Sequence, residues 1–323
     1  MQNNLNNWLK HYWFEIAIFL IGTACILSTF FADSYRGNKL DPTLAGQFGD
    51  FIGGFIGTFF ALISTVLLFA TLKNQRNSSA LQNFETKYFE LIKMHRDNVA
   101  ELEVQGLKGR KIFVALVREF REALKIIKEI NTTNNSPLNQ KQLIHISYYC
   151  LLLGTGPNST RMLITALSNF DQRLIFEIVK ALDNPFTKSE TQKQRKLTYV
   201  PFEGHQSRLG HYYRHLYQAI SYVNQQKLNI NKLEYVKTIR AQLTTHEQAL
   251  LLLNSYSPIG SSWWDDEYII TYGLVKNIPK NFFDQHEELN IALDFPDNYF
   301  EWEIAEAKSK SYYTQPIKPN LSR

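Results

Sequence analysis

The densest group of chemically versatile side chains lies in the segment GHQSRLGHYYRHLYQAI, residues 204–220. It holds three of the eight histidines of the chain and two arginines. Imidazoles transfer protons or bind metals near neutral pH, and guanidiniums bind carboxylates and phosphates. If the segment is helical, its polar side chains form a stripe beside an apolar face. The face comprises Leu209, Tyr213, Leu216 and Ile220, and the stripe comprises Arg208, His211 and His215.

The simplest interpretation of this cluster is a polar seam between two helices, with a structural or ligand-sensing role. A second helical pattern follows in YVKTIRAQLTTHEQALLLLN, residues 235–254, which adds further basic side chains. Buried basic groups need partners, and Glu234 and Glu247 are the expected carboxylates. The residues that we expect in the seam are His205, Arg208, His211, Arg214, His215 and Arg240.

A second interpretation is an all-helical ribonuclease of the HEPN type, in which an arginine is followed after about four to six residues by a histidine. Two pairs fit this spacing and would form the catalytic set: Arg208 with His215, and Arg240 with His246. Chance also produces such pairs in a chain of this composition, so the spacing alone is not specific.

Other chemistries have less support in the sequence. His211 and His215 are one helical turn apart, but no nearby cysteine or carboxylate completes a set of metal ligands. No phosphate-binding glycine loop, serine nucleophile motif or CxxC pair occurs. We therefore expect no metal and no cofactor, and we favour a protein that is not an enzyme. The net charge of +5, from 35 basic and 30 acidic residues, is too balanced to indicate direct DNA binding.

Helical periodicity dominates the polar part of the chain and predicts an all-α fold. The predicted helices lie at 112–130, 140–153, 160–182, 206–227 and 231–254. The segment NPFTKSETQKQRK, residues 184–196, is predicted to be an exposed, mobile loop. We expect a helical cytoplasmic domain over residues 111–310 and a disordered tail over residues 311–323.

Two apolar runs precede this domain and predict a two-helix transmembrane hairpin over residues 1–75. The first span, about 13–31, contains the uncharged run IAIFLIGTACILSTFF behind several aromatic residues. The second span, 51–72, is uncharged and covers about 33 Å at ~1.5 Å per residue, enough for a hydrocarbon core. A signal peptide is the alternative for the first run, but the small-x-small cleavage site is missing. Buried core helices are the alternative for both.

Charges flanking the two runs predict the orientation of the hairpin. Lys10 precedes the first run, Lys73 and Arg76 follow the second, and the loop at 32–47 has no net charge. An excess of basic residues outside the loop places both termini in the cytoplasm. Apolar residues at helical spacing continue beyond the second span, so we expect a helical stalk over residues 76–110.

Glycines just before and within the start of the second span suggest self-association in the membrane. Gly49, Gly53 and Gly57 are four residues apart, as in the small-xxx-small pattern by which membrane helices approach closely. We therefore expect contact with lipid and a homo-oligomer. Asp50 stands next to this stripe, and two roles for it remain open: an N-cap of the helix, or a residue that lines a water-filled path.

The order of four segments resembles the putative phage abortive infection protein family. They are FGDFIGGFIGTFFALISTVLLFATLKNQ, FETKYFELIKMHRDNV, GHQSRLGHYYRHLYQAI and IRAQLTTHEQALLLLN, and the resemblance extends from the second span to about Gly273. It implies a bacterial inner-membrane protein that limits phage spread by killing or arresting the infected cell. Similar two-span proteins act as effectors beside phage-sensing partners. The resemblance implies no active-site residues.

Three functional hypotheses follow for this chain. The first is a membrane effector of anti-phage defence, whose cytoplasmic domain senses infection or is released by a silencing partner, and whose hairpins associate and disrupt the membrane. The second is a membrane-tethered HEPN-like ribonuclease. The third is a non-toxic membrane-anchored scaffold or sensor.

Overall fold

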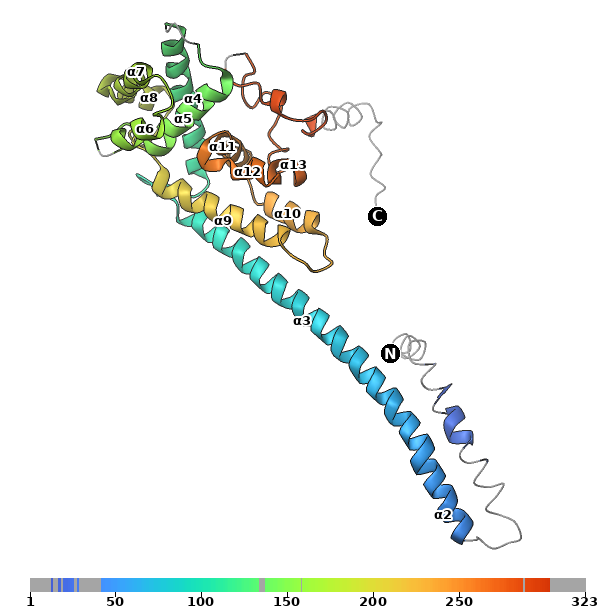
Figure 1. Cartoon of the computed structure of the whole chain (residues 1–323). Coiled ribbons are helices and arrows are strands. Elements are labelled where there is room, and N and C mark those ends of the chain that lie inside the picture. The colour runs from blue at the N-terminus through green and yellow to red at the C-terminus, as the bar shows by residue number, and fades with distance from the viewer. Residues whose placement is uncertain are drawn as a thin grey trace, which may run out of the picture. The chain divides into compact units, whose positions relative to one another are not determined.

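The computed structural model describes residues 42–133, 137–157, 159–286 and 288–302, together with residues 13, 17, 18, 20–25 and 28 (Figure 1). The chain divides into two compact units, Met1–Gln82 and Asn83–Arg323. The predicted first span, 13–31, lies largely outside the described residues. The predicted disordered tail, 311–323, lies entirely outside them.

A long apolar helical segment dominates the described part of the first unit. Helix α2 (Pro42–Phe51) continues through a π-helical turn, η1 (Ile52–Ile56), into α3 (Gly57–Glu101), which extends into the second unit. Among the described residues, the continuous helical stretch Gly49–Glu101 is the one long and apolar enough to cross a membrane. The second predicted span, 51–72, lies within it. This is a hint of membrane association by length and composition, and the paired hairpin stays a prediction.

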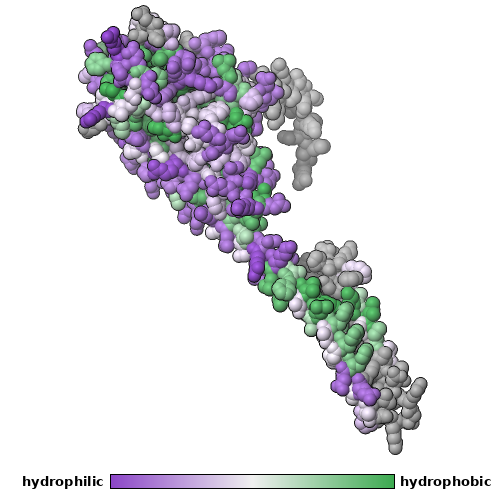
Figure 2. Space-filling view, viewed as in Figure 1, coloured by the Kyte–Doolittle hydropathy of each residue, from purple (hydrophilic) through white to green (hydrophobic). Residues whose placement is uncertain are grey.

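The apolar part of this helix is not covered by the rest of the described chain. No residue in its most apolar window is buried, and the side chains of Phe55 and Phe69 are each 68% exposed. Figure 2 shows hydrophobic residues, in green, along this part of α3. Contiguous apolar surface of this kind marks a contact with lipid or protein.

The second unit begins with the C-terminal part of α3, which buries one stripe of side chains: Phe84, Tyr88, Leu91, His95 and Val99. The chain then forms a two-stranded antiparallel hairpin, β1 (Glu103–Val104) and β2 (Leu107–Lys108), with Val104 opposite Leu107. The two turn residues, Gln105 and Gly106, both have positive φ, as a type I′ turn requires.

Helices make up most of the remaining described residues, so the predicted all-α fold class is confirmed. In chain order they are α4 (Lys111–Thr132), α5 (Gln140–Leu153), α6 (Thr160–Ala166), α7 (Gln172–Asp183), α8 (Pro185–Gln194), α9 (Gln206–Asn224), α10 (Lys232–Arg240), α11 (Thr245–Ser255), η2 (Pro258–Gly260), α12 (Ser262–Asp265), α13 (Tyr268–Thr271) and η3 (Ile291–Asp294).

Helix α4 lies at the centre of this unit. Its apolar residues recur every three or four positions, and it packs against α5, α7 and α11. Fully buried side chains on this face include Phe113, Leu116, Phe120, Leu124 and Ile127. The core therefore assembles around α4, and the other helices are positioned by contact with it.

Two predicted helices are each divided in the structure. The predicted helix at 160–182 ends at Ala166, and α7 starts after Asp171, whose side chain accepts a hydrogen bond from the Arg173 amide. The predicted helix at 231–254 ends at Arg240, and α11 starts after Thr244, which forms a capping box with Glu247. Local capping thus ends a continuous apolar pattern.

The predicted mobile loop at 184–196 is wrong, because residues Pro185–Gln194 form α8. The Asn184 side chain accepts a hydrogen bond from the Phe186 amide at 2.8 Å, and Pro185 occupies the first helical position. Both are helix-start features. Lys188 also pairs with Asp183 and Glu203, at 2.8 and 2.7 Å.

Candidate functional site

Helix α9 carries most of the predicted polar cluster. Its apolar face is buried as expected: Leu209, Leu216 and Ile220 are fully covered, and Tyr213 is 8% exposed. The polar side chains of α9 do not form one continuous seam. They point into three separate surroundings: the start of α9, the groove beside the end of α3, and a pocket against α11 and α12.

At the start of α9, His205 meets a buried acid from α4. Its Nε2 lies 3.0 Å from Oε2 of Glu119, and both side chains are almost completely buried. Glu119 also accepts hydrogen bonds from the Tyr199 hydroxyl and the Phe202 amide, each at 2.7 Å. Burial, followed by the nearby Glu119 carboxylate, raises the pKa of Tyr199 far above its ordinary value. Through these contacts, Glu119 holds the residues that lead into α9 against α4.

Sequence reasoning missed Glu119, although a signal was present. The residue lies within the apolar periodicity of residues 112–130, between Leu116 and Ala123 on the same helical face. A carboxylate in that position has to be buried, and a buried carboxylate requires donors.

Arg208 and His211 line a groove of about 290 Å³ with residues at the end of α3 and in β1. The Nε of Arg208 donates to the carbonyl of Glu103 at 3.0 Å, and His211 is exposed. The Arg208 contact joins α9 to the segment that follows α3, which gives Arg208 a positioning role.

His215 faces His95 of α3. His95 is 4% exposed, and burial lowers its pKa to about 4, with further contributions from His215 and Arg110. The ring of His95 lies 5.0 Å from that of Tyr212, centroid to centroid. Burial, with smaller contributions from the His215 imidazole and the Arg110 guanidinium, thus keeps His95 neutral at physiological pH.

The four residues of the ribonuclease hypothesis have different surroundings. Arg240 donates through Nη1 to the carbonyls of Tyr272 and Gly273, both at 3.2 Å. His246 packs edge-on against the ring of Phe282. Among the described residues, no hydrogen bond, ion pair or ring contact joins any two of Arg208, His215, Arg240 and His246. The geometry assembles no arginine–histidine centre from these pairs.

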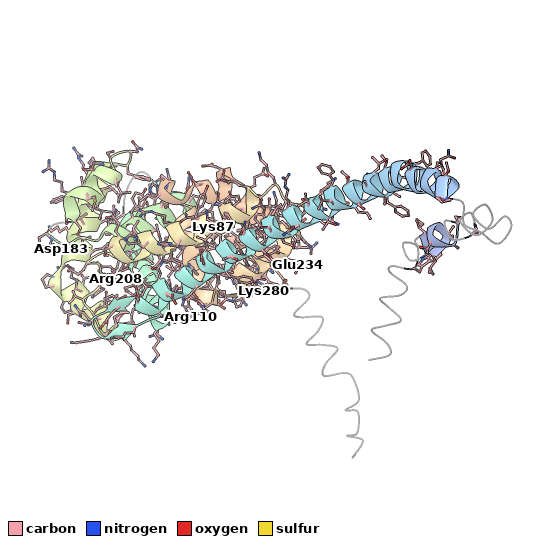
Figure 3. The ribbon with its side chains drawn as sticks, turned by 90° about the horizontal axis from the view of Figure 1, so that it is seen from below. Lys87, Arg110, Asp183, Arg208, Glu234 and Lys280 are labelled. Carbon is pink, nitrogen blue, oxygen red and sulfur yellow. The ribbon has the colours of Figure 1, made fainter. Side chains whose placement is uncertain are left out.

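The two expected carboxylate partners differ in their roles. Glu234 pairs with Lys237 at 2.6 Å, and Figure 3 shows it well apart from Arg208. Glu247 is fully buried: it caps α11 through Thr244, accepts a hydrogen bond from the Tyr212 hydroxyl, and lies 3.7 Å from Arg110. Glu247 is therefore a buried partner of Tyr212 of α9, whereas Glu234 is exposed on α10.

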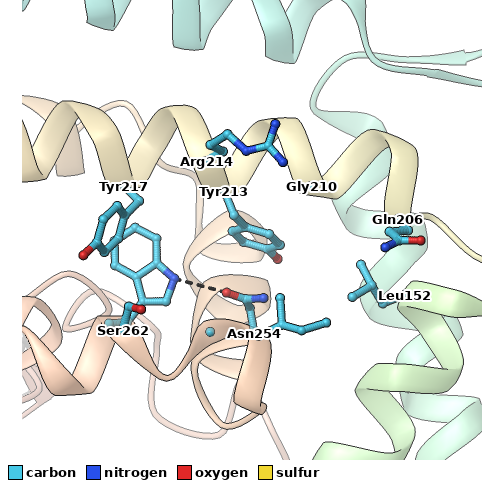
Figure 4. Close-up of a pocket in the computed structure, with 11 residues that line it drawn as sticks. Leu152, Gln206, Gly210, Tyr213, Arg214, Tyr217, Asn254 and Ser262 are labelled. Carbon is cyan, nitrogen blue, oxygen red and sulfur yellow. Dashed lines mark hydrogen bonds between the residues drawn. The ribbon is translucent and has the colours of Figure 1, made fainter. Parts of the chain in front are cut away.

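On its other side, α9 faces a pocket of about 380 Å³ (Figure 4). Five α9 residues line it: Gln206, Gly210, Tyr213, Arg214 and Tyr217. The opposite wall consists mainly of Asn254, Ile259, Gly260, Ser262 and Trp263. Arg214 is the single charged lining residue, and of the predicted seam residues it alone lines this pocket.

Hydrogen bonds hold the floor of the pocket. Asn254 donates from Nδ2 to the Tyr148 hydroxyl at 3.0 Å and accepts from Trp263 Nε1 at 3.1 Å. The Tyr213 hydroxyl donates to the carbonyl of Leu250 at 3.0 Å. Since the Asn254 side chain is paired at both ends, this wall is pre-formed.

Metal ligation has no evident centre in the described part of the chain. No group of three or more His, Cys, Asp or Glu side chains is arranged there to hold an ion. His211 and His215, the pair one turn apart, differ in setting, since His211 is exposed and His215 is half-buried against α3.

The fold and the site define an all-α protein that has, among its described residues, one helix apolar enough to enter a membrane. Residues 204–283 match a family described as "putative phage abortive infection protein". The match confirms the resemblance over this segment, from the start of α9 to the turns after α13, and supports a role in phage defence. All residues lining the pocket except Leu152 lie within it. Comparison with curated proteins and with solved structures gives no match.

Proposed function

We propose that this chain is an inner-membrane effector of phage defence that causes abortive infection by disrupting the membrane. The observation that carries the proposal is the uncovered apolar segment of α3, in a chain whose residues 204–283 match the abortive infection family. In this proposal copies of the chain associate through Gly49, Gly53 and Gly57, with both termini in the cytoplasm.

Space around the glycines supports contact with another molecule. A Cβ atom placed on Gly49 or Gly53 would meet nothing within 4 Å in the described chain. Glycine in a helix interior costs about 0.5–1 kcal/mol relative to alanine in water. Contacts within the single chain do not explain these glycines. Close approach of a second helix in lipid would explain them, because small residues let the two backbones come together.

The polar groups of the segment are compatible with lipid. The hydroxyls of Thr65 and Thr71 donate to the carbonyls of Ala61 and Leu67, each at 2.8 Å, and Thr58 donates to Gly54. Hydroxyls paired within their own helix avoid the cost of an unsatisfied group in hydrocarbon. Thus these three threonine hydroxyls need no further polar partner in a bilayer.

The second unit would then sense infection or bind a phage-sensing or silencing partner. The decisive experiment compares the whole chain with residues 83–323 during induced expression in bacteria, while a potential-sensitive dye reports on the membrane. We expect the whole chain to depolarise the membrane and stop growth, and the 83–323 fragment to do neither.

Two outcomes would contradict this proposal. Toxicity of the folded 83–323 fragment would place the harmful activity in the cytoplasmic unit and favour the ribonuclease hypothesis. Growth arrest by the whole chain with an unchanged membrane potential would exclude membrane disruption. A harmless chain whose deletion leaves phage yield unchanged would favour a scaffold.

A further inference from the structure

We infer that the pocket between α9 and the α11–α12 segment binds a mononucleotide, with the phosphate at Arg214 and the base against the aromatic wall. Its volume of about 380 Å³ is within the range of small-molecule sites. This inference rests on the pocket alone and does not depend on membrane disruption.

The charge of the pocket favours an anion. Arg214 is exposed, and among the described residues no hydrogen bond or ion pair engages its side chain. No acidic residue lines the pocket. Asp266, outside the lining, accepts a hydrogen bond from the Tyr217 hydroxyl. A free guanidinium is suited to bidentate contact with a phosphate.

The walls of the pocket favour a planar group. Tyr213 and Tyr217 extend from α9 toward Asn254 and Ser262 on the opposite side (Figure 4). The ring of Trp263 packs edge-on against Tyr217, with 5.2 Å between centroids. Aromatic side chains around a pocket provide stacking surfaces for a base. Gln206 and Ser262 add donors and acceptors that can pair with its edge.

Gly210 is the feature that points most directly to a ligand. It lies inside α9, where glycine weakens a helix relative to alanine. A Cβ on Gly210 would meet nothing within 4 Å, so the packing of the described chain does not require glycine there. The position lines the pocket, and the Arg214 side chain lies along α9 toward it (Figure 4). Glycine at 210 keeps open the space that a phosphate at Arg214 would occupy.

The test uses the whole chain purified in mild detergent, with AMP, GMP, CMP and UMP as probes in equilibrium dialysis. We expect at least one of them to bind at one molecule per chain. Inorganic phosphate, ribose 5-phosphate and the matching nucleoside should each bind about tenfold or more weakly, because each lacks the base or the phosphate. Binding should weaken as the salt concentration rises.

Two variants and their matched controls locate the site. Arg214→Gln should raise the dissociation constant by about tenfold or more, as loss of a charged hydrogen-bond donor predicts, while Arg173→Gln on α7 should leave it unchanged. Gly210→Leu should abolish binding by filling the pocket, while Gln218→Leu, exposed on the same helix, should not.

The inference is overturned if none of the four nucleotides binds, or if Arg214→Gln binds as tightly as the unchanged protein. Equal affinity for inorganic phosphate and nucleotides would show that the aromatic wall does not contribute to binding. Circular dichroism tests whether Gly210→Leu is folded. If it is not, the dissociation constant of Arg214→Gln, a substitution at the surface, still tests the inference. Membrane depolarisation is a separate measurement, so failure of one proposal leaves the other intact.

Discussion

Gly260 lies directly against the backbone of Asn254: a Cβ atom at residue 260 would stand 2.2 Å from the Asn254 carbonyl oxygen. Neither that oxygen nor the short η2 turn can move freely, because Asn254 is held by Tyr148 and Trp263. The close approach sets the distance between the end of α11 and the turn that leads to α12.

Gly260→Ala should therefore destabilise the fold, by about 1–3 kcal/mol, as overpacking of a buried site does. Gly210→Ala is the matched control. It adds the same methyl group inside a helix with open space around it, so it should stabilise the fold by about 0.5–1 kcal/mol. Thermal unfolding of the two variants in detergent measures both effects. Equal changes in both would contradict the close-contact explanation.

Loss of the Glu119 charge should destabilise the second unit. Glu119→Gln weakens the contacts with Tyr199, Phe202 and His205 and leaves an amide donor facing donors, which we expect to cost about 2 kcal/mol. Glu129→Gln, exposed on the same helix, is the control and should change stability little. Denaturant midpoints of the two variants decide; an unchanged midpoint for Glu119→Gln would show that the charge is dispensable.

Burial of His95 should make stability depend on pH. Its folded pKa of about 4 lies below the ordinary value of 6.5, so the unfolded chain binds more protons between these values. Its contribution is therefore fully present above pH 6.5 and decreases as the pH falls toward 4, by up to about 3 kcal/mol.

The measurement is the free energy of unfolding at pH 5 and at pH 7.5 for the unchanged protein and for His95→Gln. We expect the difference between the two pH values to shrink in His95→Gln. The exposed His286→Gln should retain it. A pH dependence that is identical in all three proteins would assign the effect to groups other than His95.

Substitution of the glycines in the apolar segment should distinguish the helix face that carries the glycine stripe from the neighbouring face. Gly53→Ile should abolish toxicity and depolarisation at unchanged expression, because it blocks close approach on the stripe with Gly49 and Gly57. Gly54→Ile is a matched control, since its Cβ also meets nothing within 4 Å and it lies off the stripe. Loss of toxicity in both variants would indicate a general effect on the π-helical turn instead.

Local signals predicted a good part of this fold. The helix predicted at 140–153 has those bounds in the structure, because Asn139 and Gln142 form a capping box in front of a continuous apolar run. The buried face of α9 followed from the spacing of Leu209, Tyr213 and Leu216. Helix bounds and buried faces can be predicted in this way because they depend on residues only a few positions apart in the sequence.

The rest depended on contacts that are distant in sequence. Arg240 meets the carbonyls of residues 272 and 273, and Glu119 meets residues near 200, pairings that no local pattern encodes. A single polar seam between two helices was predicted because Arg208, His211 and His215 share one stripe of a helix, but α9 is packed on several sides. The pocket was missed for the same reason, since its second wall comes from residues 254–263.

The distance along the chain between Glu119 and its partners also has a consequence for biosynthesis. The hydrogen bonds span 80 to 86 residues, which a ribosome adds in roughly 4–17 s at typical bacterial rates. During that interval α4 has emerged while its acid has no donors, so it must stay hydrated and α4 cannot complete its packing. We expect nascent chains stalled before residue 199 to be cleaved by protease within α4, and chains that extend past α9 to be resistant.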